Sequence, residues 1–184
     1  VKKGRNRATA GWNRQIAEEV LEPLGKTLPE GIRDNNSASR YITQTVNEAY
    51  NEAFDGMTVK LTSKLDGELK DLLSKANLNK AAKQTFKEEI TQIRSMLKKG
   101  VNGRFVKDVD SNIKKRVLAF RKSTNLNESP IEEPLRAARE LFKKSVIEQN
   151  PAQGAKWLAT DRAYGQVASF QKAVGSGNKA GQFS

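Results

Sequence analysis

The sequence predicts an all-α protein, an elongated bundle of about seven helices joined by short loops and forming part of a larger oligomeric assembly. Apolar residues return at three- and four-residue spacing along most of the chain, which is the pattern of amphipathic helices. No segment shows the alternation expected of a strand. Hydrophobic residues make up only 36% of the 184 residues, so we expect some apolar surface to be buried between subunits.

The beginning of the chain predicts a basic arm followed by two helices. Residues 1–14 carry five cations and no acid, which is typical of a basic arm. A first helix is predicted over residues 13–24, and Pro23 should distort its last turn. A second helix is predicted over residues 37–54, with Ser37 as its N-cap.

The middle of the chain predicts three further helices. The first covers residues 59–75, although Gly67 weakens its interior. The second is about twenty residues long and begins after Asn79, a residue type that caps helix N-termini well. The third covers residues 105–122, after a short turn at residues 101–103.

The end of the chain predicts an antiparallel helical hairpin over residues 129–184. Pro130 is well placed near the start of the sixth helix, and Asn150 followed by Pro151 ends that helix and begins the seventh. We expect the aromatic and aliphatic face of the seventh helix to pack against the sixth. Three aromatic residues are the candidates for packing and assembly: Trp157, Tyr164 and Phe170.

The residue types present exclude most catalytic chemistry. The chain has no histidine and no cysteine, which removes the commonest general base, the commonest metal ligand and every thiolate site. Neighbouring carboxylates such as Glu132 and Glu133 point to different sides of a helix, so they do not form a catalytic pair. No glycine-rich phosphate loop is present. We therefore expect no catalytic residue, no cofactor, no metal and no enzymatic activity in these residues.

Positive charge is the main functional feature. The net charge is +12, divided as +5 over the arm (1–14), −4 over 15–60, +8 over 61–128 and +3 over 129–184. The helical bundle expected over 15–128 therefore has a basic middle block. Clustered cations of this kind neutralise phosphates. The candidate DNA or phosphate contacts are Lys98, Lys99, Arg104, Lys107, Lys114, Lys115, Arg116, Arg121 and Lys122.

Three interpretations of this charge stay open on the residues alone. Lysine-rich faces are common on solvated helices that bind nothing. Contact with nucleic acid would be non-specific, since the sequence has no helix-turn-helix, zinc-finger or basic-zipper pattern. Basic amphipathic helices also bind anionic membrane surfaces.

Two parts of the chain resemble large helical virion proteins of tailed bacteriophages. Residues 13–32, NRQIAEEVLEPLGKTLPEGI, and residues 41–54, YITQTVNEAYNEAF, resemble the Leu-Glu-Pro-Leu/Ile-Gly, Leu-Pro-x-Gly and Ala-Tyr-x-x-Ala pattern of those proteins. Residues 135–184 resemble their later part, in which a helix ends at Asn-Pro, an aromatic helix follows and a Gly-x-Phe-Ser/Thr segment comes last. The family comprises internal virion, DNA-transfer or ejection proteins of short-tailed phages and prophages.

The resemblance implies a structural protein of the virion interior that oligomerises near the portal and helps the genome to cross the host envelope. Its implied partners are copies of itself, the portal, other internal or ejection proteins, double-stranded DNA without sequence preference and, transiently, the host membrane. After ejection it would lie in the host envelope or periplasm. Any lytic enzyme domain would lie in another part of a longer chain. The alternative is a non-specific nucleic-acid-binding helical protein.

Overall fold

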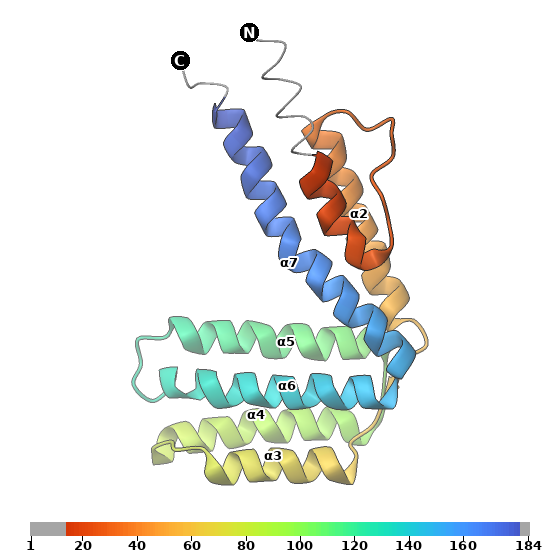
Figure 1. Ribbon diagram of the computed structural model, residues 1–184. Helices are drawn as coiled ribbons and strands as arrows, with labels where there is room; N and C mark the ends of the chain where they lie inside the picture. The colour runs from red at the N-terminus through yellow and green to blue at the C-terminus, as the bar shows by residue number, and fades with distance from the viewer. Residues whose placement is uncertain (1–13, 181–184) are drawn as a thin grey trace. The chain divides into compact units, whose positions relative to one another are not determined.

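A computed structural model describes residues 14–180, with side chains placed for all of these except 168 and 172–180. Over the described residues, seven α-helices and one two-stranded ladder account for nearly all regular structure, so the all-α prediction is confirmed (Figure 1). The predicted basic arm lies outside the described residues except for Arg14. Of the described residues, 14–53 and 155–180 form one compact unit, unit 1, and 54–154 form a second, unit 2.

This division corrects the one expected from the sequence. Helix α6 (Glu132–Gln149) lies in unit 2, whereas α7 (Pro151–Ala180) belongs to unit 1 from Ala155 onward. The hairpin expected over residues 129–184 is therefore not a unit of the fold. The helix break at Pro151 was predicted correctly, but an apolar stripe indicates only that a helix face is buried and not against which partner.

Unit 1 is built from the first helix (14–21), α2 (Asn35–Phe54) and α7. The first helix tightens into a 3₁₀ turn at Glu22–Leu24, as Pro23 predicted, and Gly25 ends this turn in the left-handed conformation with φ of 62°. These three helices share one core, although α7 is far from the other two in the sequence. The buried members of this core are Ala17, Val20, Leu21, Leu28, Ala38, Ile42, Val46, Ala163, Val167 and Phe170.

Asp34, and not Ser37, caps α2. The Asp34 carboxylate accepts a hydrogen bond from the backbone N–H of Ser37 at 2.9 Å, so Ser37 occupies the third position of the helix. Hydrogen bonds from Ser37 lower the pKa of the Asp34 carboxyl. The predicted cap at Ser37 is therefore wrong by three positions, since the aspartate that precedes the helix makes the capping hydrogen bond.

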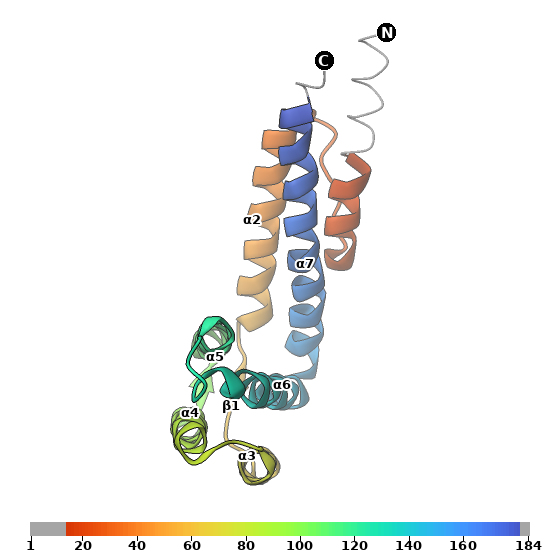
Figure 2. The same ribbon diagram turned by 90° about the vertical axis from the view of Figure 1, so that its left-hand side faces the viewer.

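Unit 2 is an up-and-down arrangement of four helices. These are α3 (Ser63–Lys75), α4 (Lys80–Lys98), α5 (Gly103–Lys122) and α6, which a short 3₁₀ turn at Ser129–Ile131 precedes. Figure 1 shows consecutive helices running in opposite directions, and Figure 2 shows them nearly end-on around a common centre. As predicted for short connections, α3 contacts α4 and α5 contacts α6. Side chains of Thr62, Asn79 and Asn102 cap α3, α4 and α5, so the Asn79 prediction is confirmed.

A small strand pair replaces two segments that were expected to be a helix start and a turn. Strand β1 (Thr58–Val59) pairs antiparallel with β2 (Val101–Asn102), with Thr58 opposite Asn102 and Val59 opposite Val101. Such short strands have too few residues for an alternating pattern to be recognised. Val59 is nevertheless completely buried. The pair links the first residues of unit 2 to the connection between α4 and α5.

Candidate nucleic-acid interface

The predicted phosphate contacts lie on unit 2 and are all exposed. Lys98 is the last residue of α4 and Lys99 is its C-cap, and the other seven belong to α5. Unit 2 carries 21 basic and 13 acidic side chains, a net charge of +8, whereas the described residues of unit 1 carry eight of each. The positive charge of the described chain is therefore concentrated in one unit.

Helix α5 has an apolar face and a cationic face. Val106, Val109, Ile113, Val117 and Phe120 are buried in the core of unit 2, because their spacing places them on one side of the helix. The opposite side carries the cations, including Arg104, Lys107, Lys115 and Lys122 along one line and Lys114 and Arg121 along the next. Helix periodicity thus gathers six cations on the solvent side of α5. We call these six residues the α5 basic face.

Arg116 is exposed but does not belong to this face. Its Nε donates to a carboxylate oxygen of Glu89 on α4 at 2.8 Å, and its Nη2 donates to the same oxygen. The guanidinium also lies 5.0 Å from the centroid of the Phe120 ring. The hydrogen bonds to Glu89 raise the pKa of Arg116. Because Glu89 is only 8% exposed, Arg116 serves chiefly to compensate a buried carboxylate.

Salt bridges among the described residues engage all three lysines of α3, but they leave out four of the six cations of the α5 basic face. On α3, Lys64 pairs with Glu148 at 2.8 Å, and Lys70 and Lys75 pair with aspartates one turn earlier. Within residues 14–180, no salt bridge engages Arg104, Lys115, Arg121 or Lys122, and none engages Lys98 or Lys99.

Of the two aspartates of α5, one pairs with an arginine of α6 and the other lies among the cations on the solvent side. Asp110 is used by Arg139 of α6 in a two-bond ion pair at 2.8 and 2.9 Å. On the solvent side of α5 this leaves Asp108 as the acidic residue that dilutes the cations. The face therefore keeps a surplus of positive charge that is directed at solvent.

The three aromatic residues predicted to pack have different environments. Trp157 and Phe170 are each 1% exposed, and Phe170 belongs to the core of unit 1. Tyr164 is 53% exposed, with its ring 6.1 Å from the ring of Tyr50 in an edge-on arrangement. The Tyr50 hydroxyl donates to Asp161 at 2.6 Å. Trp157 and Phe170 are thus core residues, and Tyr164 is a surface residue.

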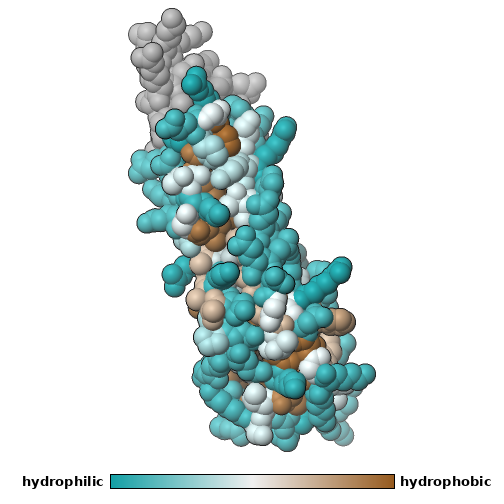
Figure 3. All heavy atoms as spheres, turned by 90° about the vertical axis from the view of Figure 1, so that its right-hand side faces the viewer, coloured by the Kyte–Doolittle hydropathy of each residue, from teal (hydrophilic) through white to brown (hydrophobic). Residues whose placement is uncertain are grey.

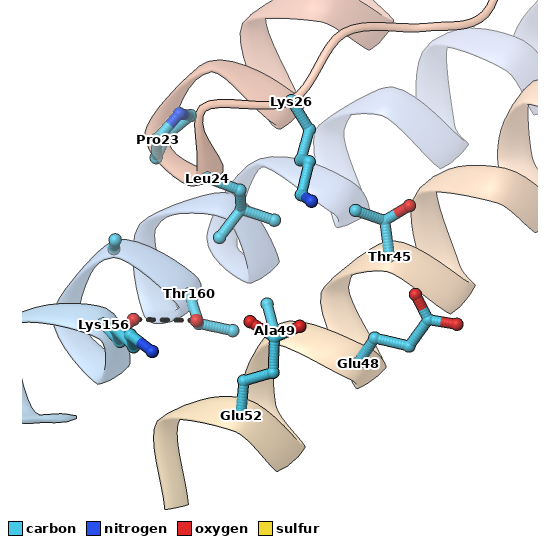
Figure 4. A pocket seen from close by; sticks show the side chains of 10 residues that line it. Pro23, Leu24, Lys26, Thr45, Glu48, Ala49, Glu52, Lys156 and Thr160 are labelled. Carbon is cyan, nitrogen blue, oxygen red and sulfur yellow. Dashed lines mark hydrogen bonds between the residues drawn. The ribbon is translucent and has the colours of Figure 1, made fainter.

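A shallow groove of about 190 Å³ in unit 1 was not predicted from the sequence. Figure 4 shows it between the 3₁₀ turn, α2 and α7. Lys26 and Lys156 line it together with Glu48 and Glu52, so its charges balance. The Thr160 hydroxyl donates to the Lys156 carbonyl at 2.8 Å and is satisfied within the helix. Pro23 and Leu24 of the Leu-Glu-Pro-Leu-Gly segment line the groove. That segment was noted in the sequence, but it did not indicate a groove.

Within residues 14–180, no three Asp or Glu side chains lie close enough together to bind a metal ion. None of the helices in this range is both long and apolar enough to cross a bilayer. On the face drawn in Figure 3, hydrophilic side chains predominate and apolar groups form small separate patches.

No family model matches the chain, and a search of curated proteins and of solved structures yields no match either.

Proposed function

We propose that the protein is a structural component of a phage particle, an internal or ejection protein that oligomerises near the portal and helps deliver the genome across the host envelope. The sequence resemblance to internal virion proteins motivates this proposal. One structural observation supports it further: residues of the first resembling segments (13–32 and 41–54) and residues of the last one from Ala163 onward share the core of unit 1, whereas residues 135–154 of the last segment lie in unit 2.

This core joins the pattern-bearing residues directly. Leu21 begins the Leu-Glu-Pro-Leu-Gly segment and Leu28 begins the Leu-Pro-x-Gly segment, and both are buried in the cluster that contains Phe170 of the aromatic helix. Sequence patterns that are spread over a chain are expected to occur together when they specify one packed unit. The basic block, which has no counterpart in the resembling pattern, falls in unit 2.

The proposal is tested by quantitative mass spectrometry of purified particles before and after genome release. We expect several copies per intact particle and depletion of the protein from the emptied particles, with the portal and capsid proteins as retained controls. Imaging of the released material should show a symmetric oligomer. Absence from the particles, or equal retention before and after release, would contradict the proposal.

A second candidate function is that of a cellular, non-specific nucleic-acid-binding protein. The observation that favours it is the position of four cations on α5 that no salt bridge engages within residues 14–180, namely Arg104, Lys115, Arg121 and Lys122. This candidate predicts binding to nucleic acid by the purified chain but no incorporation into particles. The particle measurement therefore separates the two functions, since both are compatible with binding to nucleic acid.

A further inference from the structure

We infer that the α5 basic face, together with Lys98 and Lys99, contacts the sugar-phosphate backbone of duplex nucleic acid without sequence preference. The inference rests on the proposed function, because an internal protein of a phage particle would lie beside a duplex genome. It assigns the surface of the protein that contacts the duplex. The cations of Arg104, Lys115, Arg121 and Lys122 carry it, since none of them has an ion-pair partner within residues 14–180.

The dimensions of the face suit a duplex. From Arg104 to Lys122 the helix advances by about 27 Å, given a rise of about 1.5 Å per residue. One turn of duplex DNA advances by about 34 Å. Lys98 and Lys99 extend the cationic surface at the N-terminal end of α5, across the left-handed turn at Gly100. A rigid row of cations of this length can neutralise phosphates along one side of a single turn.

The rigidity of the row comes from the core of unit 2. Opposite the cations, Val109, Ile113 and Val117 are buried, and α5 packs along α6. The Arg139–Asp110 and Arg116–Glu89 ion pairs fasten the flanks of α5 to α6 and α4. The cations are therefore presented from an ordered helix, and binding does not have to order the backbone first.

Single-stranded nucleic acid is a poorer fit to this face. Proteins that bind single strands combine cations with aromatic side chains on which bases stack. The line of Arg104, Lys107, Lys115 and Lys122 contains no aromatic residue, and the exposed Phe105 lies to one side of it. Phosphate contact without stacking favours a duplex.

An anionic membrane is also a poorer fit. A helix that binds at a membrane interface buries its apolar side among the lipids. The apolar side of α5 already forms part of the core of unit 2, so insertion would require unit 2 to open. Leu118, which is 41% exposed, is the large apolar side chain of the solvent-facing line.

The test uses the whole chain and two variants with the same change in charge. The face variant carries Arg104→Gln, Lys115→Gln, Arg121→Gln and Lys122→Gln. The control variant carries Lys80→Gln, Lys83→Gln, Lys87→Gln and Lys144→Gln, which removes four exposed cations from α4 and α6. All eight positions are exposed, so circular dichroism and thermal unfolding should match those of the unaltered chain.

Binding is measured by fluorescence anisotropy with a random-sequence 25-base-pair duplex over a range of salt concentrations. For the unaltered chain we expect log K to fall with log salt with a slope of about −4 to −5, since each phosphate contact contributes about −0.9. In the face variant the slope should become shallower by about 3 to 4, since four contacts are removed, and affinity should fall by about 100-fold or more at low salt. The control variant should bind within about threefold of the unaltered chain.

Several results would overturn the inference. Equal losses in both variants would mean that net charge alone matters, and unchanged binding in the face variant would place the contact elsewhere. Binding to a 25-nucleotide single strand, or to vesicles containing anionic lipid, as tight as binding to the duplex would exclude the duplex as the preferred partner. The proposed function fails separately, through absence of the protein from particles, so the two failures are distinguishable.

Discussion

The side-chain amide of Asn150 holds the backbone of Thr58 by two hydrogen bonds. The Thr58 N–H donates to Asn150 Oδ1 at 3.1 Å, and Asn150 Nδ2 donates to the Thr58 carbonyl at 3.0 Å. Gln149 repeats this pattern with the backbone of Lys60 at 3.0 and 3.1 Å. Two consecutive side-chain amides at the end of α6 thus satisfy the edge of β1 that does not face β2, as a further strand would.

Replacing Asn150 should therefore loosen the strand pair. Asn150 is only 8% exposed, and its Nδ2 also donates to the Val146 carbonyl at 3.0 Å. We expect Asn150→Ala to lower the free energy of unfolding by about 1–2 kcal/mol, because it leaves two half-buried backbone groups of Thr58 without their partner. Gln149→Ala, at a more exposed position, should cost about 1 kcal/mol. Hydrogen exchange should quicken at Thr58 in the first variant and at Lys60 in the second, and equal protection in all three chains would contradict this role.

Gly103 should tolerate no side chain. A Cβ atom at this position would lie 1.6 Å from the backbone carbonyl oxygen of Phe54, so the backbone itself would have to shift. We expect Gly103→Ala to destabilise unit 2 by more than about 3 kcal/mol. The matched control is Gly67→Ala, since a Cβ atom there meets nothing within 4 Å and Gly67 lies inside an exposed part of α3.

That control should increase stability by about 0.5–1 kcal/mol, because alanine restricts the unfolded chain and favours the helix. Urea denaturation of both variants measures the two effects. A neutral Gly103→Ala would show that the start of α5 can move away from Phe54.

Removing Arg116 should affect stability more than binding. Its loss leaves the buried Glu89 carboxylate without its hydrogen-bond partner, for which we expect a cost of about 1–2 kcal/mol in Arg116→Gln. In the double variant with Glu89→Gln the cost should be smaller than the sum of the single changes. The salt slope of duplex binding should stay as in the unaltered chain. A shallower salt slope in Arg116→Gln would show that Arg116 contacts phosphates and would contradict this prediction.

Acid should weaken the ion pairs of Asp66. Hydrogen bonds from Arg94 and Lys70, both at 2.6 Å, lower the pKa of this carboxyl from 3.8 to about 2. A group whose pKa falls on folding stabilises the folded state above its unfolded pKa and loses this effect as pH falls toward the folded value. The Tm difference between the unaltered chain and Asp66→Asn should therefore be constant above about pH 5 and close between about pH 4 and pH 2. A difference independent of pH would exclude this linkage.

The sequence predicted the helices well because their periodicity and end signals are local. Asn79 caps α4, Pro23 lies in the 3₁₀ turn that ends the first helix, and Pro151 begins α7, as their side chains predict. The partner of α7 was not predictable in this way, since Ala163 and Phe170 meet residues that are more than a hundred positions earlier in the chain. The strand pair was missed because each strand has only two residues, and because its edge is completed by two side chains that lie far along the sequence.

The candidate interface shows the same limit. All nine predicted cations are exposed, which agrees with the helical periodicity that places them away from the buried apolar positions. What periodicity did not reveal was that Arg116 has a carboxylate partner on another helix, 27 positions away. Tyr164 likewise shares a helix with Trp157 and Phe170, and only the packing around it shows that it faces solvent.

The order of the two units along the chain has a consequence during synthesis. All of unit 2 is made before Ala155 is reached, so its four helices can condense while the ribosome is still adding the rest of the protein. The core around Leu21 and Ile42 must wait for Phe170 to emerge from the exit tunnel. Until then its apolar side chains remain uncovered, and nascent chains that stall in this interval should be the ones that recruit chaperones.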